Sequence, residues 1–218
     1  EGKRWKETMK EEGVFMFHKK AKTFCLFCGS QFGDLTDLPE QIEAFAFGLS
    51  EKGYRVIFGG GQEGLMGRVY KGAARAKQHH ITGVPFFSML HELKDSAKFE
   101  KLLIAKTLGR RKDLFVKYAD VFVIFPGAVG TIDEYFHTTV LNAYGLIDTP
   151  IIIANINGYY DVMEQLTMWP VQHQFMKADM LKNIYSVASI EDILPCFEKR
   201  PKEASLFTKY QLLFQKNG

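Results

Sequence analysis

Two glycine-rich segments have the residue types and spacing that bind phosphate. The first, residues 59–67, reads GGGQEGLMG and contains G-x-G-x-x-G at Gly59, Gly61 and Gly64. Glycine lets a backbone approach a phosphate closely, and a helix predicted to follow would supply free N–H groups. A dinucleotide site also needs an acidic residue about 20 positions later, and no carboxylate follows before Glu92. We therefore expect phosphate or sugar binding without NAD, the alternative being a turn that serves packing only.

The second segment, residues 126–134, reads PGAVGTIDE and follows the apolar run VFVIF. Gly127 and Gly130 bracket a tight loop that opens a predicted helix. Thr131 can cap that helix and also offer its hydroxyl to a phosphate. Glu134 then lies one turn inside the helix, facing back toward the loop. A purely structural alternative is that Thr131 and Glu134 form a capping box.

Charged side chains near these segments are further candidates. Arg110, Arg111 and Lys112 are consecutive, so on a helix they cannot all face one site, and we expect most of this cluster to be solvated. Asp133 is a rival carboxylate, about 100° around the helix from Glu134.

Two other patterns fit structural roles better than chemical ones. Cys25 and Cys28 form C-x-x-C, but at that spacing on a strand they point to opposite faces. This favours two small buried apolar residues over redox chemistry. His137 follows Glu134 by one turn, and we expect it at the surface or at an interface.

Short apolar strands alternate with helices along the chain. This alternation predicts an α/β fold with a Rossmann-like, doubly wound parallel sheet. Ligands bind beyond the carboxyl ends of such strands, so the loops after Cys28, Phe58 and Phe125 should form the site. We expect strands at 23–28, 55–58, 81–85, 101–105, 121–125, 151–154 and 185–187, and helices at 36–49, 65–78, 107–118, 131–144, 160–175 (with a break or kink at Pro170) and 190–197.

Length and charge define one domain with two short extensions. The 218 residues are 46% hydrophobic and 24% charged, which is typical of a single globular domain. The net charge is +3 in residues 1–22, −3 in residues 23–197 and +3 in residues 198–218. We therefore expect a domain at 23–197, extensions at 1–22 and 198–218, and no nucleic-acid-binding face on the domain. No apolar run has the length of a membrane span or of a secretory signal, and three cysteines are too few for a disulfide framework, so we expect a cytoplasmic protein without membrane contact.

Four motifs occur in order along residues 23–197: FCGS at 27–30, GGGQEGLMG at 59–67, GRRK at 109–112 and PGAVGTIDE at 126–134. They resemble F-C-G-S, G-G-G-x-x-G-L-M-G, M-H-x-R-K and P-G-G-x-G-T-x-x-E of the LOG (Lonely guy) family, long misannotated as lysine decarboxylases. The resemblance implies hydrolysis of the N-glycosidic bond of a nucleoside 5′-monophosphate, such as AMP or a cytokinin ribotide. The products would be a free base and ribose 5-phosphate.

The same resemblance implies roles for particular residues. Arg111 and Glu134 would be the catalytic pair. It also implies a homodimer whose active sites border the subunit interface, and an enzyme with no cofactor and no metal. The implied substrate-binding residues are Ser30, Gly60, Gly61, Gly64, Lys112, Gly127, Ala128, Gly130 and Thr131, of which Gly127, Gly130 and Thr131 would hold the 5′-phosphate.

The residue types suit that chemistry. Cleavage of a glycosidic bond builds positive charge on the ribose in an oxocarbenium-like transition state. Glu134 can stabilise this charge, bind ribose hydroxyls or orient the attacking water. Arg111 stays protonated, so we expect it to keep Glu134 ionised and to contact phosphate or ribose rather than to act as an acid.

Some positions depart from the family pattern. Ala128 replaces the second glycine of P-G-G, Leu108 and Gly109 replace the Met and His of M-H-x-R-K, and Thr149 replaces a common lysine. A Cβ at position 128 is costly if that residue needs a positive φ or a very close phosphate. The alternative is therefore a non-catalytic carrier of the same fold that binds a nucleotide or the molybdenum cofactor.

Overall fold

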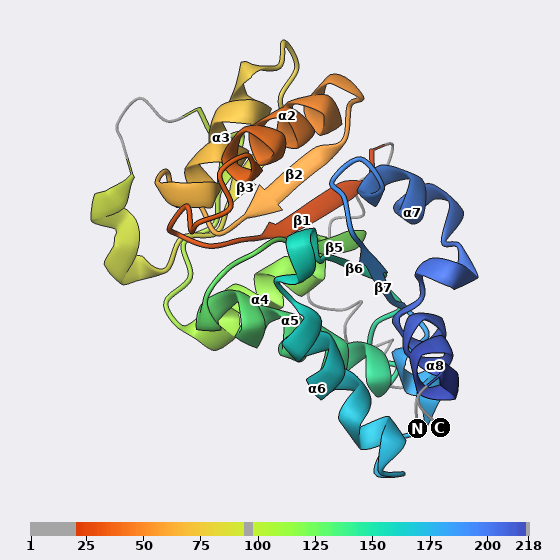
Figure 1. Cartoon of the computed structure of the whole chain (residues 1–218). Helices are drawn as coiled ribbons and strands as arrows, with labels where there is room; N and C mark the ends of the chain where they lie inside the picture. Colours follow the sequence, from red (N-terminus) through yellow and green to blue (C-terminus); the bar gives the residue numbers. More distant parts are fainter. Residues whose placement is uncertain (1–20, 94–97, 217–218) are drawn as a thin grey trace.

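A computed structural model describes residues 21–93 and 98–216 of the chain. At its centre is a seven-stranded sheet in the order β4-β3-β2-β1-β5-β6-β7 with every neighbouring pair parallel (Figure 1). The α/β class and the doubly wound parallel sheet are thus confirmed. Most of the predicted N-terminal extension, residues 1–20, lies outside the described residues. The strands are β1 (Thr23–Phe27), β2 (Arg55–Phe58), β3 (Ile81–Gly83), β4 (Lys101–Leu102), β5 (Val121–Ile124), β6 (Ile151–Ala154) and β7 (Ile184–Val187).

Helices cover both faces of this sheet (Figure 1). One face packs against α2 (Leu38–Glu51), α3 (Gly64–Arg75) and α7 (Ile193–Lys199). The other face packs against α4 (Leu108–Tyr118), α5 (Val129–Ala143), α6 (Asp161–Gln172) and α8 (Leu206–Lys216). Short 3-10 helices lie in the connections: η1 (Phe87–Glu92), η2 (Ile156–Gly158), η3 (Ala178–Leu181) and η4 (Lys202–Ala204). Within the described ranges, no helix has the length and apolarity needed to cross a membrane.

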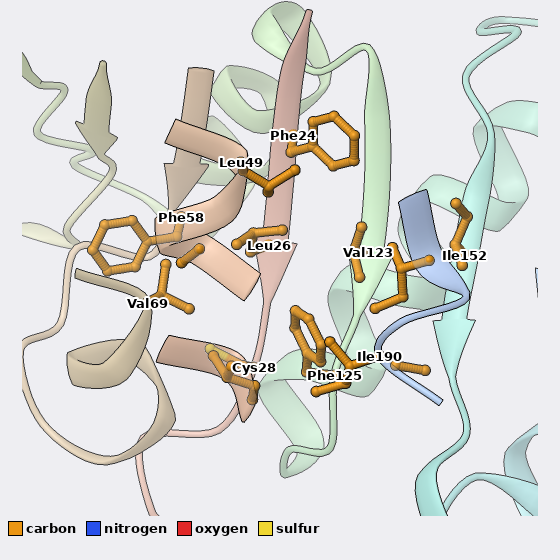
Figure 2. Close-up of a cluster of buried hydrophobic side chains, with 14 of the residues drawn as sticks. Phe24, Leu26, Cys28, Leu49, Phe58, Val69, Val123, Phe125, Ile152 and Ile190 are labelled. Carbon is orange, nitrogen blue, oxygen red and sulfur yellow. The ribbon is translucent and has the colours of Figure 1, made fainter. Parts of the chain in front are cut away.

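Side chains along the strands alternate between two hydrophobic cores. Phe24, Leu26 and Cys28 point into the core under α2, α3 and α7 (Figure 2). Cys25 and Phe27 point into the core on the opposite face. The two cysteines of C-x-x-C are therefore buried on different sides of the sheet, and burial raises the pKa of both thiols. This confirms the structural interpretation of that motif.

Several elements end earlier than the sequence predicts. β3 and β4 are short because the chain leaves the regular sheet after Gly83 and Leu102, and only an isolated bridge pairs Phe86 with Ala105 beyond them.

Pro170 does not break α6, which continues to Gln172. Pro170 lies in the last turn, where its missing N–H removes a hydrogen bond only near the helix end.

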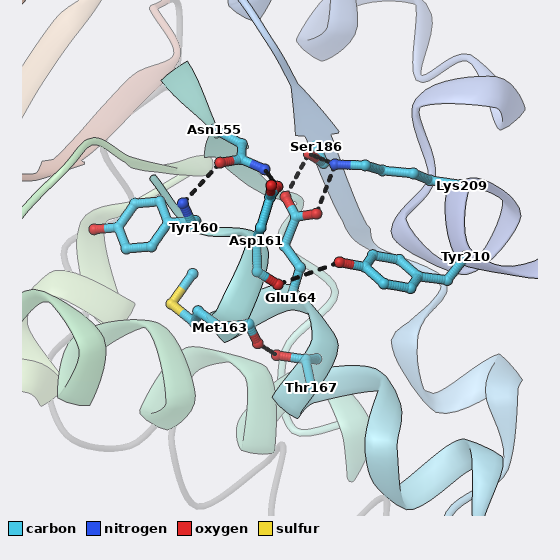
Figure 3. Close-up of polar contacts among 9 residues, drawn as sticks. All are labelled: Asn155, Tyr160, Asp161, Met163, Glu164, Thr167, Ser186, Lys209 and Tyr210. Atoms are coloured by element: carbon cyan, nitrogen blue, oxygen red, sulfur yellow. Dashed lines mark hydrogen bonds and ion pairs between the residues drawn. The ribbon is translucent and has the colours of Figure 1, made fainter. Parts of the chain in front are cut away.

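α8 has no counterpart among the predicted helices and lies in the segment predicted to be the C-terminal extension. Leu206 and Tyr210 of α8 are buried in the second core. Lys209 lies 2.6 Å from a carboxylate oxygen of Glu164 on α6, and the Glu164 side chain is fully buried (Figure 3). The end of the described chain is therefore packed onto the domain.

The order of the strands reverses at β1. The chain proceeds from β1 through β2, β3 and β4 on one side, and then returns to place β5 on the other side of β1. The loops after β1 and β5 consequently border the point of reversal at the carboxyl edge of the sheet, where ligands bind in folds of this type.

Candidate active site

The three loops predicted to form the site meet at this edge. Gly29, after β1, donates its N–H to the carbonyl oxygen of Pro126, after β5, over 3.1 Å. The carbonyl oxygen of Gly29 accepts the N–H of Met66, in the first turn of α3, over 3.3 Å. The loop that contains Gly60 and Gly61 leads directly into that turn. Gly29 therefore connects the loop after β1 with the loop after β5 and with the start of α3, which directly follows the loop after β2.

Two glycines of the motifs are required by this packing, whatever the loops bind. Gly64 has a φ of +56°, and a Cβ on it would overlap the backbone carbonyl of Ser30. A Cβ on Gly127 would overlap the hydroxyl of Thr131. Their presence thus has a structural cause of its own, and their contact with a substrate stays a prediction.

Arg111 lies in the first turn of α4 and reaches three different elements. Its Nε donates to the carbonyl oxygen of Val84 over 2.9 Å, and its Nη2 to that of Gly59 over 3.4 Å. Its Nη1 donates to Oε1 of Glu134 over 3.1 Å. Arg111 thereby joins the ends of β2 and β3 to α5, so the two residues predicted to act together are in direct contact.

Glu134 is a buried carboxylate whose pKa is shifted. Only 10% of its side chain is exposed. Burial raises the pKa of Glu134 to about 7; Asp133 also raises it, whereas Arg111 and Lys112 oppose the rise. A carboxyl group with this pKa exchanges protons in the neutral range, which suits a group that handles charge or protons during a reaction.

The helix that carries Glu134 begins earlier than predicted. α5 starts at Val129 with Ala128 as its N-cap, so Thr131 is the third helical residue and does not cap the helix, and the alternative of a capping box is wrong. Ala128 has a φ of −86°, which any L-residue adopts, so the Cβ at this position causes no backbone strain. Ala128, Val129 and Gly130 are exposed, and Thr131 is buried against Gly127. The open start of α5 thus presents backbone N–H groups beside the Arg111–Glu134 pair.

A second ion pair lies alongside the first. Lys112 donates to both carboxylate oxygens of Asp133, over 2.8 and 2.9 Å. Consecutive residues of α4 therefore pair with consecutive residues of α5. Arg110 is exposed, but Arg111 and Lys112 are largely covered. The expectation that most of this basic cluster is solvated is therefore wrong, because α5 supplies a partner for each of the two.

The other candidate residues are not part of the Arg111–Glu134 ion pair. The side chain of Asp133 is 55% exposed, so Glu134 is the buried carboxylate of the two. His137 is partly buried; burial and Lys112 lower its pKa, and its Nε2 has no hydrogen-bond partner in the described part of the chain. Ser30 is exposed in the loop after β1. Nowhere in the described ranges do three potential metal ligands of the His, Cys, Asp or Glu type cluster together.

Two tyrosines outside the four motifs contact the loop after β5. Tyr160 donates its hydroxyl to the carbonyl oxygen of Phe125 over 2.7 Å, and Tyr159 donates to that of Gly127 over 2.9 Å. The available signal was their position: they follow β6, which pairs with β5 in the sheet.

Comparisons with known proteins agree with the motifs. A family described as possible lysine decarboxylases matches residues 66–196, more than half of the chain. A probable cytokinin riboside 5′-monophosphate phosphoribohydrolase, LOG6 of Arabidopsis thaliana, is 31% identical over 157 residues, which cover 70% of this chain and 78% of the relative. The chain belongs to the LOG family.

Further similarities extend over nearly the whole domain. A second LOG protein of Arabidopsis thaliana, the cytokinin riboside 5′-monophosphate phosphoribohydrolase LOG3, is 27% identical over 198 residues, covering 88% of this chain and 92% of the relative. Among solved structures, the molybdenum cofactor binding protein from Rippkaea orientalis superposes with a TM-score of 0.63 at 15% identity, covering 83% of this chain and 98% of that one. That likeness shows a shared fold.

Proposed function

We propose that this LOG-family chain hydrolyses the N-glycosidic bond of a nucleoside 5′-monophosphate and releases a free base and ribose 5-phosphate. The observation that carries the proposal is the covered ion pair of Arg111 and Glu134 beside the open start of α5. The two LOG relatives described above are named for this class of reaction.

In this reaction, a water oxygen bonds to C1′ of the ribose while the bond from C1′ to the base nitrogen breaks. The departing base takes up a proton. Positive charge develops on the ribose as the bond breaks. Ionised Glu134 would stabilise that charge or orient the water, and a pKa of about 7 leaves much of it ionised at neutral pH.

Arg111 would act by fixing Glu134. Three of its N–H groups are already donated to Val84, Gly59 and Glu134, so the guanidinium is held in place from two strands and one helix. A guanidinium keeps its proton under all relevant conditions. The remaining N–H groups stay available for a ribose or phosphate oxygen.

The phosphate would lie at the start of α5. The first N–H groups of a helix lack partners within the helix and attract anions. A Cβ added to Gly130 would meet no atom within 4 Å, so the space beside this turn is open to a ligand. Binding the phosphate there would hold the ribose near Glu134 and supply binding energy remote from the bond that breaks.

Incubation of the purified protein with AMP and with isopentenyladenosine 5′-monophosphate, followed by chromatographic assay of the free base, tests the proposal. We expect base release from at least one 5′-monophosphate and none from the Glu134→Ala or Arg111→Ala variants. Absence of base release from every 5′-monophosphate tried, with folded protein, would contradict hydrolysis.

The second candidate is binding without catalysis, by a carrier of a nucleotide or of the molybdenum cofactor. The Rippkaea orientalis protein, described as binding that cofactor, has the same fold. Ala128 is the residue that favours this candidate in the sequence, but its negative φ means that the Cβ causes no backbone strain. Tight binding of AMP by calorimetry without any product would favour the carrier.

We further propose that two copies of the chain associate through α5 and α6. Tyr135 of α5 and Thr167 of α6 are hydrogen-bonded, so the two helices pack together. Their outer faces carry exposed apolar side chains at helical spacing: Val140 on α5 and Tyr144 directly after it, and Val162, Leu166 and Trp169 on α6. Exposed apolar patches of this kind mark association surfaces.

We also retain the prediction of a cytoplasmic location, which fractionation of expressing cells would test.

A further inference from the structure

Successive carbonyl oxygens in the loop after β5 are each held by a donor from another part of the chain. The Phe125 oxygen accepts the Tyr160 hydroxyl at 2.7 Å, and the Pro126 oxygen accepts the Gly29 N–H at 3.1 Å. The Gly127 oxygen accepts the Tyr159 hydroxyl at 2.9 Å. The next carbonyl, of Ala128, accepts N–H groups from the first turn of α5. The loop is therefore anchored at every peptide from β5 to the helix.

These anchors also orient N–H groups. In a planar trans peptide the C=O and the following N–H point in opposite directions. By holding the oxygen of Gly127, Tyr159 thus fixes the direction of the Ala128 N–H, directly before the first turn of α5. This N–H directly precedes Val129 and Gly130, two exposed residues at the start of α5, where the phosphate is proposed to bind.

The two tyrosines are themselves rigidly placed. The side-chain oxygen of Asn155 accepts the backbone N–H of Tyr160 at 2.7 Å, and its amide nitrogen donates to Asp161 at 2.8 Å (Figure 3). A turn with positive φ at Asn157 (+53°) and Gly158 (+74°) precedes them. The rings of Tyr159 and Tyr160 then pack edge to face, with centroids 4.8 Å apart. The loop after β6 therefore forms a stiff support for the loop after β5.

Burial distinguishes the roles of the two hydroxyls. Tyr160 is buried in the core, so its hydroxyl must be satisfied for the fold itself. Tyr159 is 47% exposed, and water could satisfy its hydroxyl without the loop. The bond from Tyr159 to Gly127 therefore bears mainly on the loop.

We propose that Tyr159 is a positioning residue that holds the Gly127–Ala128 peptide so that the start of α5 binds the phosphate of a sugar 5-phosphate or nucleoside 5′-monophosphate. This inference rests on the proposed function for its ligand. It differs from that proposal in assigning a role to a residue outside the four motifs.

The test is Tyr159→Phe, which removes one hydroxyl and keeps the ring. We expect the Kd for ribose 5-phosphate, measured by calorimetry, to rise about fivefold, as expected for one hydrogen bond. The KM for the 5′-monophosphate substrate should rise by a similar factor with kcat within twofold of wild type. Amide hydrogen exchange in residues 126–131 of the free protein should also become faster.

Tyr135→Phe is the matched control, because it removes a buried tyrosine hydroxyl that bonds Thr167 at 2.8 Å instead of the loop. It should lower thermal stability and leave the Kd for ribose 5-phosphate unchanged. An unchanged Kd in folded Tyr159→Phe overturns the inference, as does a wild-type protein that does not bind ribose 5-phosphate. If the wild type binds ribose 5-phosphate but releases no base, the proposed hydrolysis fails while a weaker Tyr159→Phe complex still supports the positioning role.

Discussion

At the scale of single residues, Glu134 experiences opposing effects. Burial disfavours the charged carboxylate, and the neighbouring guanidinium of Arg111 favours it. Burial is the larger effect and places the pKa of Glu134 at about 7. The adjacent Asp133 is more than half exposed and paired with Lys112. Two consecutive carboxylates thus have different environments, and Glu134 is the one that is buried in contact with Arg111.

The first prediction concerns the pH dependence of activity. If ionised Glu134 stabilises the transition state, kcat/KM should be low at pH 5, rise through about pH 7 and level off above it. Glu134→Gln should abolish turnover at every pH. Asp133→Asn is the control and should keep most of the activity, with the profile moved toward lower pH because the Asp133 charge that raises the pKa of Glu134 is removed. A flat profile between pH 5 and 8 in the wild type would contradict this role.

The second prediction concerns stability. The pKa of Glu134 is about 7 in the folded chain and near its ordinary value of 4.5 when unfolded. Between these values the folded state binds more protons, so this group's contribution to the free energy of unfolding falls as pH rises from 4.5 to 7. Glutamine does not titrate, so this fall is absent in Glu134→Gln. As pH rises through this range, the free energy of unfolding of the variant should therefore increase by about 3 kcal/mol relative to that of the wild type. Urea denaturation of both proteins at pH 5 and pH 8 measures the difference, and a constant difference would refute it.

At the scale of elements, the start of α5 serves both the fold and the site. Ala128 caps the helix without a side-chain hydrogen bond, and no acidic residue lies in the first turn. The N–H groups and the positive end of the helix dipole are therefore left for an anion. Gly130 lies in this turn with open space around it. The fold alone does not require glycine there.

The third prediction concerns Gly130, where the fold does not require glycine but the proposed phosphate site needs the space. Gly130→Ala should leave the free energy of unfolding unchanged or raise it by about 0.5–1 kcal/mol, because alanine favours helix over glycine. It should also raise the KM for the 5′-monophosphate several-fold, because a methyl group would occupy the phosphate's space. Gly48→Ala, in the last turn of α2 and equally free of contacts, is the control for stability without an effect on KM. Equal KM values in both variants would place the phosphate elsewhere.

The attachment of α8 gives a fourth prediction. Glu164 is fully buried and bonds Ser186 at 2.5 Å and Lys209 at 2.6 Å (Figure 3). Lys209→Met would leave a buried carboxylate without its cation and should cost about 3 kcal/mol of stability in urea denaturation. The additional change Glu164→Gln should recover much of that loss. Lys199→Met, at an exposed lysine, should have no measurable effect; an equal loss there would show that the buried pair is not the cause.

At the scale of the whole molecule, the sheet order brings together residues that are far apart in the chain. Placing β1 between β2 and β5 assembles three loops separated by up to about a hundred residues. The same order leaves α5 and α6 side by side (Figure 1). Exposed apolar side chains lie on both helices. The candidate site and the proposed association surface therefore share α5.

The fifth prediction tests that surface. Light scattering during size-exclusion chromatography should give twice the chain mass of 24.9 kDa at micromolar concentration. The double variant Leu166→Glu and Trp169→Glu should elute as a folded monomer, because charges replace apolar contacts on α6. Ile104→Glu, at an exposed apolar residue just after the opposite edge strand β4, should remain a dimer. A wild-type monomer would contradict the proposed association.

The sequence by itself determined the fold class and, apart from α8, the order of the main helices and strands. Apolar runs of strand length alternate with helical periodicity, and these local patterns specify a parallel sheet and predict a candidate site at its carboxyl edge. The motifs also identified Arg111 and Glu134, which the structure brings into contact at 3.1 Å.

Only the tertiary structure decided the rest, because it depends on contacts between residues distant in sequence. The start of α5 at Val129 leaves Thr131 inside the helix, where its side chain packs against Gly127. Arg111 finds its partners directly after β2 and β3, and Tyr159 anchors the loop after β5; both arrangements need the register of neighbouring strands. The pKa of Glu134 depends on how completely the surrounding elements exclude water, which no spacing of residues along the chain reveals.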